Sequence, residues 1–218
     1  MTVSLDLRVT ELLASRICHD LISPVGAINN GVELLEEMGA QVGEEAVKLI
    51  GHSADMASRR LRLFRLCYGS AGADANLSAD EVLTTMRDYI SGSRVSINWA
   101  ADKMKSAPLP KGGPKVLLNL VIIAYEALVH GGTIDVALAA DNSSKISIVA
   151  TGRGAGQRDE AWAPLHGNAQ VADLTAKTVH PYVTGQFAQQ YGVQIAHQAV
   201  AEDKIELTLA HAAAAAAA

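Results

Sequence analysis

The sequence predicts an α+β protein of two domains, in which a helical hairpin precedes an α/β sandwich of helices on one sheet. Through about the first 70 residues, apolar positions recur at alternating steps of three and four, the spacing of a helical bundle. After a linker rich in Gly, Ala, Asp and Asn, helical segments alternate with short segments of period two, as in a sheet covered by helices on one face. We expect domains at residues 1–72 and 77–211, and a low-complexity tail at 212–218.

The composition limits the partners that the chain is expected to bind. Its 218 residues carry a formal net charge of −5, which argues against a surface built for nucleic acid or anionic membrane. The longest apolar run, from Val116, has about half of the roughly 20 residues that a membrane-spanning helix needs, and the N-terminus lacks the pattern of a signal peptide. Cys18 and Cys67 form no CxxC pair, which is typical of reduced thiols. We therefore expect a cytoplasmic protein that binds neither nucleic acid nor membrane.

Two long helices are predicted for the hairpin. The first runs from about Leu5 to Met38 and the second begins near Glu44, with Gly39 and Gly43 as breakers between them. A hairpin cannot cover two wide apolar stripes alone, so we expect it to pair with a second copy as a homodimeric four-helix bundle. The stripes comprise Ala14, Ile17, Leu21, Pro24, Ile28, Gly31 and Leu35 in the first helix, and Val47, Ile50, Ala54, Ala57, Leu61, Phe64 and Tyr68 in the second.

Local patterns predict the elements of the sandwich. Ser78 to Glu81 form a capping box that opens a helix to about Ser91, and Pro114 suits the first turn of a buried helix. In chain order we expect that first helix, the strand "RVSINWA", the helix "PKVLLNLVIIAYEALVH", a hairpin of "TIDVALAAD" and "KISIVATG" around the turn "NSS", short helices ending in "VTGQFAQQYG", and a hairpin of "VQIAHQAV" and "KIELTLA".

His19 lies opposite the apolar stripe of the first helix. At 100° per residue, four stripe residues fall within about 20° of the pole opposite His19, so the imidazole points away from the bundle core. Pro24, one turn on, costs about 3 kcal/mol inside a helix because it leaves the Asp20 carbonyl without its donor. A solvated surface histidine is the alternative interpretation. The outer face around His19 holds Leu12, Ser15, Arg16, Ile22, Ser23 and Gly26.

The segment "HDLISP" resembles the H-box of two-component sensor kinases, which lies on the first helix of a dimeric hairpin. In that family the histidine carries a phosphoryl group on a ring nitrogen. The resemblance implies that His19 is the phosphoacceptor, that Asp20 orients and polarises its imidazole, and that Ser23 is the polar residue one turn on. Neutral imidazole is nucleophilic near neutral pH, which suits reversible storage of a phosphoryl group.

The same resemblance implies that residues 78–211 form an ATP-binding domain of the GHKL (Bergerat) type, but the nucleotide motifs are degenerate. The segment "NLVIIA" keeps Asn119 and has Ile123 where a kinase has its Mg²⁺-binding Asn. The segment "ATGRG" has Ala150 where a kinase has the Asp that reads adenine, and "TAKTVHPYVTG" lacks paired glycines. Isoleucine cannot bind Mg²⁺. We therefore expect no bound nucleotide, metal or other cofactor.

A kinase-like dimer without ATP chemistry is similar to one family, the dimeric histidine phosphotransferases of the ChpT type from alphaproteobacteria. The resemblance covers essentially the whole chain, from "RICHDLISPVGAINNGVELLE" through "TGRGAG" to "TGQFAQQYG". It implies a relay in which a phosphoryl group moves from the receiver aspartate of a hybrid histidine kinase to His19, and then to receiver aspartates of response regulators. The receiver brings Mg²⁺. The expected docking face consists of Leu12, Ser15, Arg16, Ile22 and Gly26.

Two other functions remain open from the sequence. A divergent ATP-dependent histidine kinase would label His19 from ATP alone, and a non-phosphorylated module that docks receivers or inhibits a kinase would not need His19. The arginine-rich segment "RRLRLFR", with Arg59, Arg60, Arg62 and Arg65, either faces acidic receivers or forms a solvated helix face.

Overall fold

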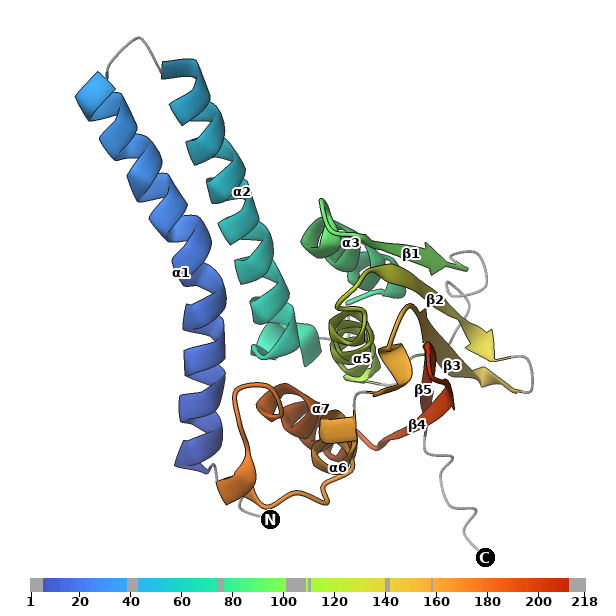
Figure 1. Cartoon of the computed structure of the whole chain (residues 1–218). Helices are drawn as coiled ribbons and strands as arrows, with labels where there is room; N and C mark the ends of the chain where they lie inside the picture. Colours follow the sequence, from blue (N-terminus) through green and yellow to red (C-terminus); the bar gives the residue numbers. More distant parts are fainter. Residues whose placement is uncertain are drawn as a thin grey trace, which may run out of the picture.

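A computed structural model describes most of the chain, and Figure 1 shows its arrangement. The expected helix start at Leu5, the breaker Gly39 and the low-complexity tail lie outside the described residues. The described residues are 6–38, 43–73, 77–100, 109, 111–139, 142–157 and 159–211.

The predicted hairpin is formed by α1, Leu7–Met38, and α2, Gly43–Cys67, which lie side by side and antiparallel (Figure 1). Small residues allow the two backbones to approach closely. A Cβ added at Gly31 would lie 2.6 Å from Cγ1 of Ile50. Although α1 has 32 residues, neither it nor any other helix among the described residues is long and apolar enough to cross a membrane.

The apolar stripe of α2 is divided between two surfaces. Ala57 and Phe64 are buried, whereas Val47 and Leu61 of the same stripe are more than half exposed. The single chain therefore covers only part of the predicted seam. Large apolar side chains that remain exposed on the hairpin include Ile22, Val25, Val32, Leu34, Met38, Val47, Leu49 and Leu61.

The two main helices of the sandwich begin as the sequence predicts. The capping box opens α3, Ala79–Ile90, because the backbone N–H of Glu81 donates to the Ser78 hydroxyl while the Glu81 carboxylate accepts from the Ser78 N–H at 2.8 Å. Pro114 lies in the first turn of α5, Gly113–Ala127. Almost every residue of α5 is buried, so this helix forms the centre of the core.

A mixed five-stranded sheet has the order β1-β2-β3-β5-β4. β1, Val95–Trp99, pairs parallel with its neighbour β2, and the other pairs are antiparallel. The remaining strands are β2, Gly132–Ala139, β3, Asn142–Thr151, β4, Val193–Ala201, and β5, Lys204–His211. Helices α3, α5 and α7 lie on one face of the sheet (Figure 1), as the alternating pattern predicts.

One predicted turn is wrong. The polar residues "NSS" belong to β3, which begins at Asn142, and Asn142 pairs with Ala139 of β2. The predicted region of short helices is present before α7, Val179–Gln190. Besides η2 at Ser70–Ala73, the short helices are η3, Ala155–Gln157, η4, Asp159–Ala161, α6, Trp162–Leu165, and η5, Val171–Asp173.

The hairpin and the sandwich share buried surface. Leu63, Phe64 and Cys67 of α2 belong to the same apolar cluster as α3 and α5. Burial raises the pKa of the Cys67 thiol, so this cysteine stays neutral within the core. A second cluster joins Val9 of α1 to Leu174 and to the first turn of α7. The start of α1 and the end of α2 are therefore packed against the sandwich.

Candidate functional site

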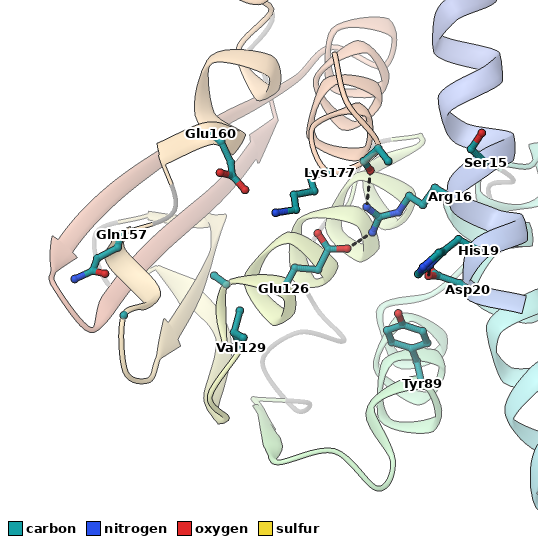
Figure 2. Close-up of a pocket in the computed structure, with 13 residues that line it drawn as sticks. Ser15, Arg16, His19, Asp20, Tyr89, Glu126, Val129, Gln157, Glu160 and Lys177 are labelled. Atoms are coloured by element: carbon teal, nitrogen blue, oxygen red, sulfur yellow. Dashed lines mark hydrogen bonds and ion pairs between the residues drawn. The ribbon is translucent and has the colours of Figure 1, made fainter. Parts of the chain in front are cut away.

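His19 projects from α1 into a groove between the hairpin and the sandwich (Figure 2). Its side chain is 88% exposed. The groove has a volume of about 860 Å³. Its lining includes Ser15, Arg16, His19 and Asp20 from α1, Tyr89 from α3, Glu126, Ala127 and Val129 in and after α5, and Gly154, Gln157, Glu160, Ala176 and Lys177 from the loops of the sandwich. The expected outer face of α1 thus forms one wall of the groove, and the sandwich of the same chain forms the other wall.

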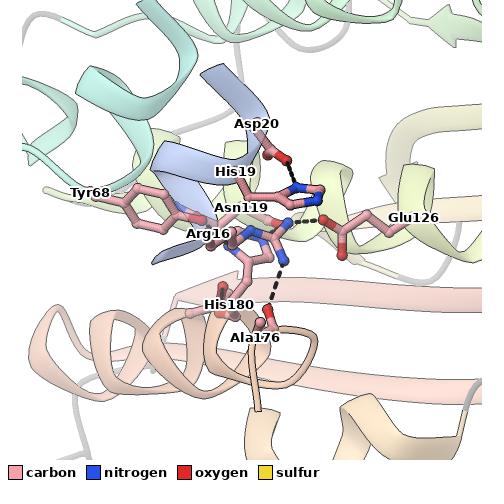
Figure 3. Close-up of polar contacts among 9 residues, drawn as sticks. Arg16, His19, Asp20, Tyr68, Asn119, Glu126, Ala176 and His180 are labelled. Atoms are coloured by element: carbon pink, nitrogen blue, oxygen red, sulfur yellow. Dashed lines mark hydrogen bonds and ion pairs between the residues drawn. The ribbon is translucent and has the colours of Figure 1, made fainter. Parts of the chain in front are cut away.

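The carboxylate of Asp20 contacts the imidazole of His19. Nδ1 lies 3.3 Å from the Asp20 Oδ1 (Figure 3). A carboxylate only accepts, so this contact favours the tautomer in which Nδ1 carries the proton and Nε2 keeps its lone pair. Ser23 is exposed one turn further along α1. The arrangement provides an accessible nucleophilic nitrogen on a rigid helix.

Arg60 of α2 supplies a donor to the carbonyl that Pro24 deprives of its helical partner. Its Nη1 donates to the backbone carbonyl of Asp20. Pro24 itself is buried within α1, which continues as one helix to Met38. The turn that bears His19 is therefore connected to the second helix of the hairpin through a charged hydrogen bond.

Arg16, one turn before His19, has its partners within the chain. Its guanidinium forms an ion pair with Glu126 of α5 and donates to the Ala176 carbonyl at 3.4 Å (Figure 3). Burial lowers the pKa of Arg16, but the Glu126 carboxylate and other nearby groups raise it more, so the net pKa lies above its usual value. The expectation that Arg16 belongs to a free outer face is therefore corrected.

The other residues of the expected docking face lie in different surroundings. Leu12 is half-buried against the cluster that contains Leu174, so it does not belong to the open part of the expected docking face. Ser15 is exposed at the groove, and Ile22 is 69% exposed. A Cβ added at Gly26 would meet no atom within 4 Å. The open part of the face therefore comprises Ser15, Ile22 and Gly26 around His19.

The sandwich that forms the second wall of the groove matches a known protein family. Residues 79–203 match the family model described as the histidine phosphotransferase C-terminal domain. This match spans more than half of the chain.

The chain belongs to the histidine phosphotransferase family. It is accordingly a phosphotransferase of a phosphorelay. It is 38% identical over 195 residues to the protein phosphotransferase ChpT of Brucella abortus (strain 2308). The matched region covers 88% of this chain and 90% of that protein. It is also similar to the solved structure of a bacterial phosphotransferase, with a TM-score of 0.75 and 33% identity over 95% of this chain and 98% of the other.

In this histidine phosphotransferase, the residues at the degenerate nucleotide motifs belong to the core. Ile123 and Ala150 are 1% and 0% exposed and lie in the main apolar cluster. The Asn119 amide donates to the carbonyls of Cys67 and Lys115, at 3.3 and 2.8 Å. Among the residues that the structure describes, no cluster of three or more His, Cys, Asp or Glu could hold a metal ion.

Residues of the histidine phosphotransferase sandwich that line the groove were not predicted from the sequence. Glu126 is a carboxylate at the end of a helix that is otherwise nearly apolar, a signal that indicates a special role. Lys177 lies in a loop and Glu160 in the three-residue helix η4, and neither segment has a periodic pattern. His180, at the start of α7, is buried behind the groove lining, and its Nδ1 lies 2.8 Å from the Tyr68 hydroxyl.

Proposed function

We propose that His19 is the phosphoacceptor of this histidine phosphotransferase. In this proposal, His19 accepts a phosphoryl group from the aspartyl phosphate of a receiver domain in a hybrid histidine kinase, and passes it to receiver aspartates of response regulators. The observation that carries the proposal is the exposed imidazole, whose Nδ1 faces the Asp20 carboxylate at 3.3 Å. The proposed reaction takes place in the cytoplasm.

The transfer step follows from this geometry. The lone pair of Nε2 attacks phosphorus, a P–N bond forms, and the P–O bond of the acyl phosphate breaks with its electron pair going to the leaving carboxylate. The ring becomes positively charged, and the Asp20 carboxylate stabilises that charge while Nδ1 keeps its proton. Mg²⁺ held by the receiver would neutralise charge on the phosphoryl oxygens. The same steps in reverse load a second receiver.

The receiver is expected to dock on the open part of the face around His19. Exposed Ile22 offers an apolar contact, whereas Ser15 and Gly26 leave space for the loops that surround a receiver aspartate. Lys177, exposed at the opposite wall of the groove, offers a positive charge to an acidic partner. Arg16 and Leu12 contribute indirectly in this proposal, because they hold the sandwich beside the docking face.

We infer that the sandwich is a GHKL-type fold that binds no ATP. The order of its elements agrees with that fold, and Ile123 and Ala150 place apolar atoms at the positions where a kinase needs a metal ligand and an adenine-reading carboxylate. The chain would then depend on a phosphorylated receiver for its phosphoryl group. Labelling of His19 by ATP alone would favour the divergent kinase instead.

We further propose that the hairpin dimerises into a four-helix bundle. The support is the apolar surface that the monomer leaves exposed on the hairpin, including Val47 and Leu61 of the predicted α2 stripe and Val25 and Val32 of α1. Monomeric proteins seldom expose a continuous apolar stripe of this kind. The bundle would bury the stripe against its copy.

The test mixes the protein with a receiver domain carrying labelled aspartyl phosphate. We expect acid-labile label on the wild type and on His52→Ala, a matched control that removes another exposed histidine of the hairpin, and no label on His19→Ala. Label on His19→Ala would contradict the proposal. Receiver binding without transfer to the wild type would favour the interaction module.

A further inference from the structure

We propose that Arg60 is a positioning residue for phosphotransfer, which acts by holding the backbone of the His19–Asp20 turn. This inference rests on the proposed role of His19 as phosphoacceptor. It combines two observations. α1 contains Pro24, and Arg60 of α2 donates to the Asp20 carbonyl that faces this proline.

The first step concerns the defect in α1. In an α-helix the N–H of residue i+4 donates to the carbonyl of residue i, so position 24 should serve the carbonyl of Asp20. Pro24 has no N–H, and its ring crowds that same carbonyl. Sharp kinks occur where this pattern is interrupted. The turn between His19 and Pro24 therefore lacks the bond that keeps a helical turn in one place.

The second step is the replacement of the missing donor. Nη1 of Arg60 donates to the Asp20 carbonyl, and the arginine is partly buried between the helices. A guanidinium is always charged and donates in a fixed planar geometry, so it holds a carbonyl more firmly than water does. Position 60 of α2 thus determines where the carbonyl at position 20 of α1 points.

The third step connects this bond to the imidazole. Asp20 is held through its backbone by Arg60 and contacts Nδ1 of His19 through its side chain. A shift of the Asp20 backbone therefore moves the carboxylate away from the ring. Displacements of about 1 Å at a reacting group reduce rates by as much as about 100-fold.

Neighbouring arginines of α2 have different partners. Arg59 donates to the Asp88 carbonyl of α3 at 3.3 Å and forms an ion pair with Asp55. Arg62 is 59% exposed and lies 3.9 Å from the Asp88 carboxylate. Arg62→Met therefore provides a control that removes the same charge from the same helix without touching the reactive turn.

The experiment is a double-mutant cycle between Arg60 and Pro24, measured in the full chain. Arg60→Met keeps the apolar stem and removes the donor, and Pro24→Ala restores the backbone N–H to position 24. With saturating phosphorylated receiver, we expect Arg60→Met to slow transfer to His19 by about 10-fold in the Pro24 background. In the Pro24→Ala background the same change should slow transfer by less than about 2-fold, because the helix again supplies the donor.

A second readout needs no receiver. Ring-nitrogen NMR of His19 reports which nitrogen carries the proton: we expect the Nδ1–H form to fall in Arg60→Met, to recover in Arg60→Met/Pro24→Ala, and to persist in Arg62→Met. Equal slowing by Arg60→Met in both backgrounds, or an unchanged His19 spectrum, would overturn the positioning role. Label on His19→Ala would instead overturn the proposed function, so the two failures are distinguishable.

Discussion

In the proposed transfer, the imidazole of His19 reacts through one nitrogen while the other holds the proton. A neutral imidazole has one donor nitrogen and one acceptor nitrogen. The carboxylate 3.3 Å from Nδ1 favours the form in which Nδ1 is the donor and Nε2 the acceptor. A ring phosphorylated as proposed would carry a positive charge, and the same carboxylate would then act as its counter-ion. Under this proposal, Asp20 would influence both the loading of the phosphoryl group and the stability of phosphorylated His19.

Replacing Asp20 by Asn tests this role. Asn keeps the shape of the side chain but loses the charge, and we expect the rate of transfer from a saturating receiver to fall by about 10- to 100-fold. The bond from Arg60 should persist because it involves the backbone. Single-turnover transfer measures the effect, with Glu33→Gln as a control that neutralises an exposed carboxylate of the same helix. Equal rates for the two variants would show that the Asp20 charge is not used.

The sequence located the central residues of the candidate site but not the groove. The orientation of His19 away from the apolar stripe follows from the period of a helix, which is a local property, whereas the role of Asp20 was expected only from the resemblance of "HDLISP" to the H-box. Arg16 and Glu126 are 110 positions apart, and no period connects them. The position of the second wall depends on how two domains pack, and that packing is determined by tertiary contacts that local patterns do not contain.

Within the hairpin, α1 and α2 approach each other closely at a glycine. Gly31 lies against Ile50, where a Cβ would be 2.6 Å from Cγ1, whereas a Cβ at Gly26 would meet no atom within 4 Å. Both glycines lie inside the same helix and lower its stability relative to alanine. They therefore form a matched pair that separates packing from helix propensity.

We expect Gly31→Ala and Gly26→Ala to change stability in opposite directions. Overpacking costs about 1–3 kcal/mol, so Gly31→Ala should lower the free energy of unfolding by about 1 kcal/mol in spite of the better helix propensity. Gly26→Ala should raise it by about 0.5–1 kcal/mol. Urea denaturation followed by circular dichroism measures both. Stabilisation by both substitutions would mean that α2 shifts to accommodate the methyl group.

The order of the helices and strands was predictable because each element has a local signal, such as the capping box of α3 or the alternation in β2. The turn at "NSS" was placed wrongly for a physical reason. Asn and Ser favour turns, but they also pair in strands when the partner strand continues opposite them. Asn142 pairs with Ala139, so tertiary pairing outweighs the local preference.

At the scale of the whole molecule, the groove exists because the sandwich is attached to α1 near His19. The attachment combines an apolar contact, Val9 with Leu174, and the ion pair between Arg16 and Glu126. The side chains of this pair are only 14% and 17% exposed. Both side chains have little access to water, so the attraction within the pair offsets part of the cost of burying each charge.

We expect Arg16→Met to lower the free energy of unfolding by about 2–3 kcal/mol, because it leaves the Glu126 carboxylate without this partner in a mostly buried position. Adding Glu126→Leu should recover part of the loss. Lys48→Met serves as the control, since it breaks the exposed pair with Glu44 and should cost less than about 0.5 kcal/mol. Chemical denaturation provides the comparison, and equal losses for Arg16→Met and Lys48→Met would show that the buried pair is not needed.

The exposed apolar stripe, which is the proposed dimer contact, lies on a different side of α1 from His19. Val25 and Val32 are seven residues apart and lie about 120–140° around α1 from His19. Val47, Ala54 and Leu61 repeat every seven residues on α2. A bundle built on this stripe would leave His19 accessible in both subunits, so dimerisation and transfer would not compete.

A charge within this stripe is therefore expected to dissociate the dimer without abolishing the fold. Val32→Glu and Leu61→Glu each place a carboxylate at a position that is 41% or 53% exposed in the monomer, so the single chain tolerates the change while a bundle core would not. We expect a rise of at least about 30-fold in the dimer dissociation constant, measured by sedimentation velocity. Val200→Glu, on β4 and 46% exposed, should leave the dimer unchanged. A monomeric wild type would refute the proposed bundle, and dimers that persist in both stripe variants would place the contact on another surface.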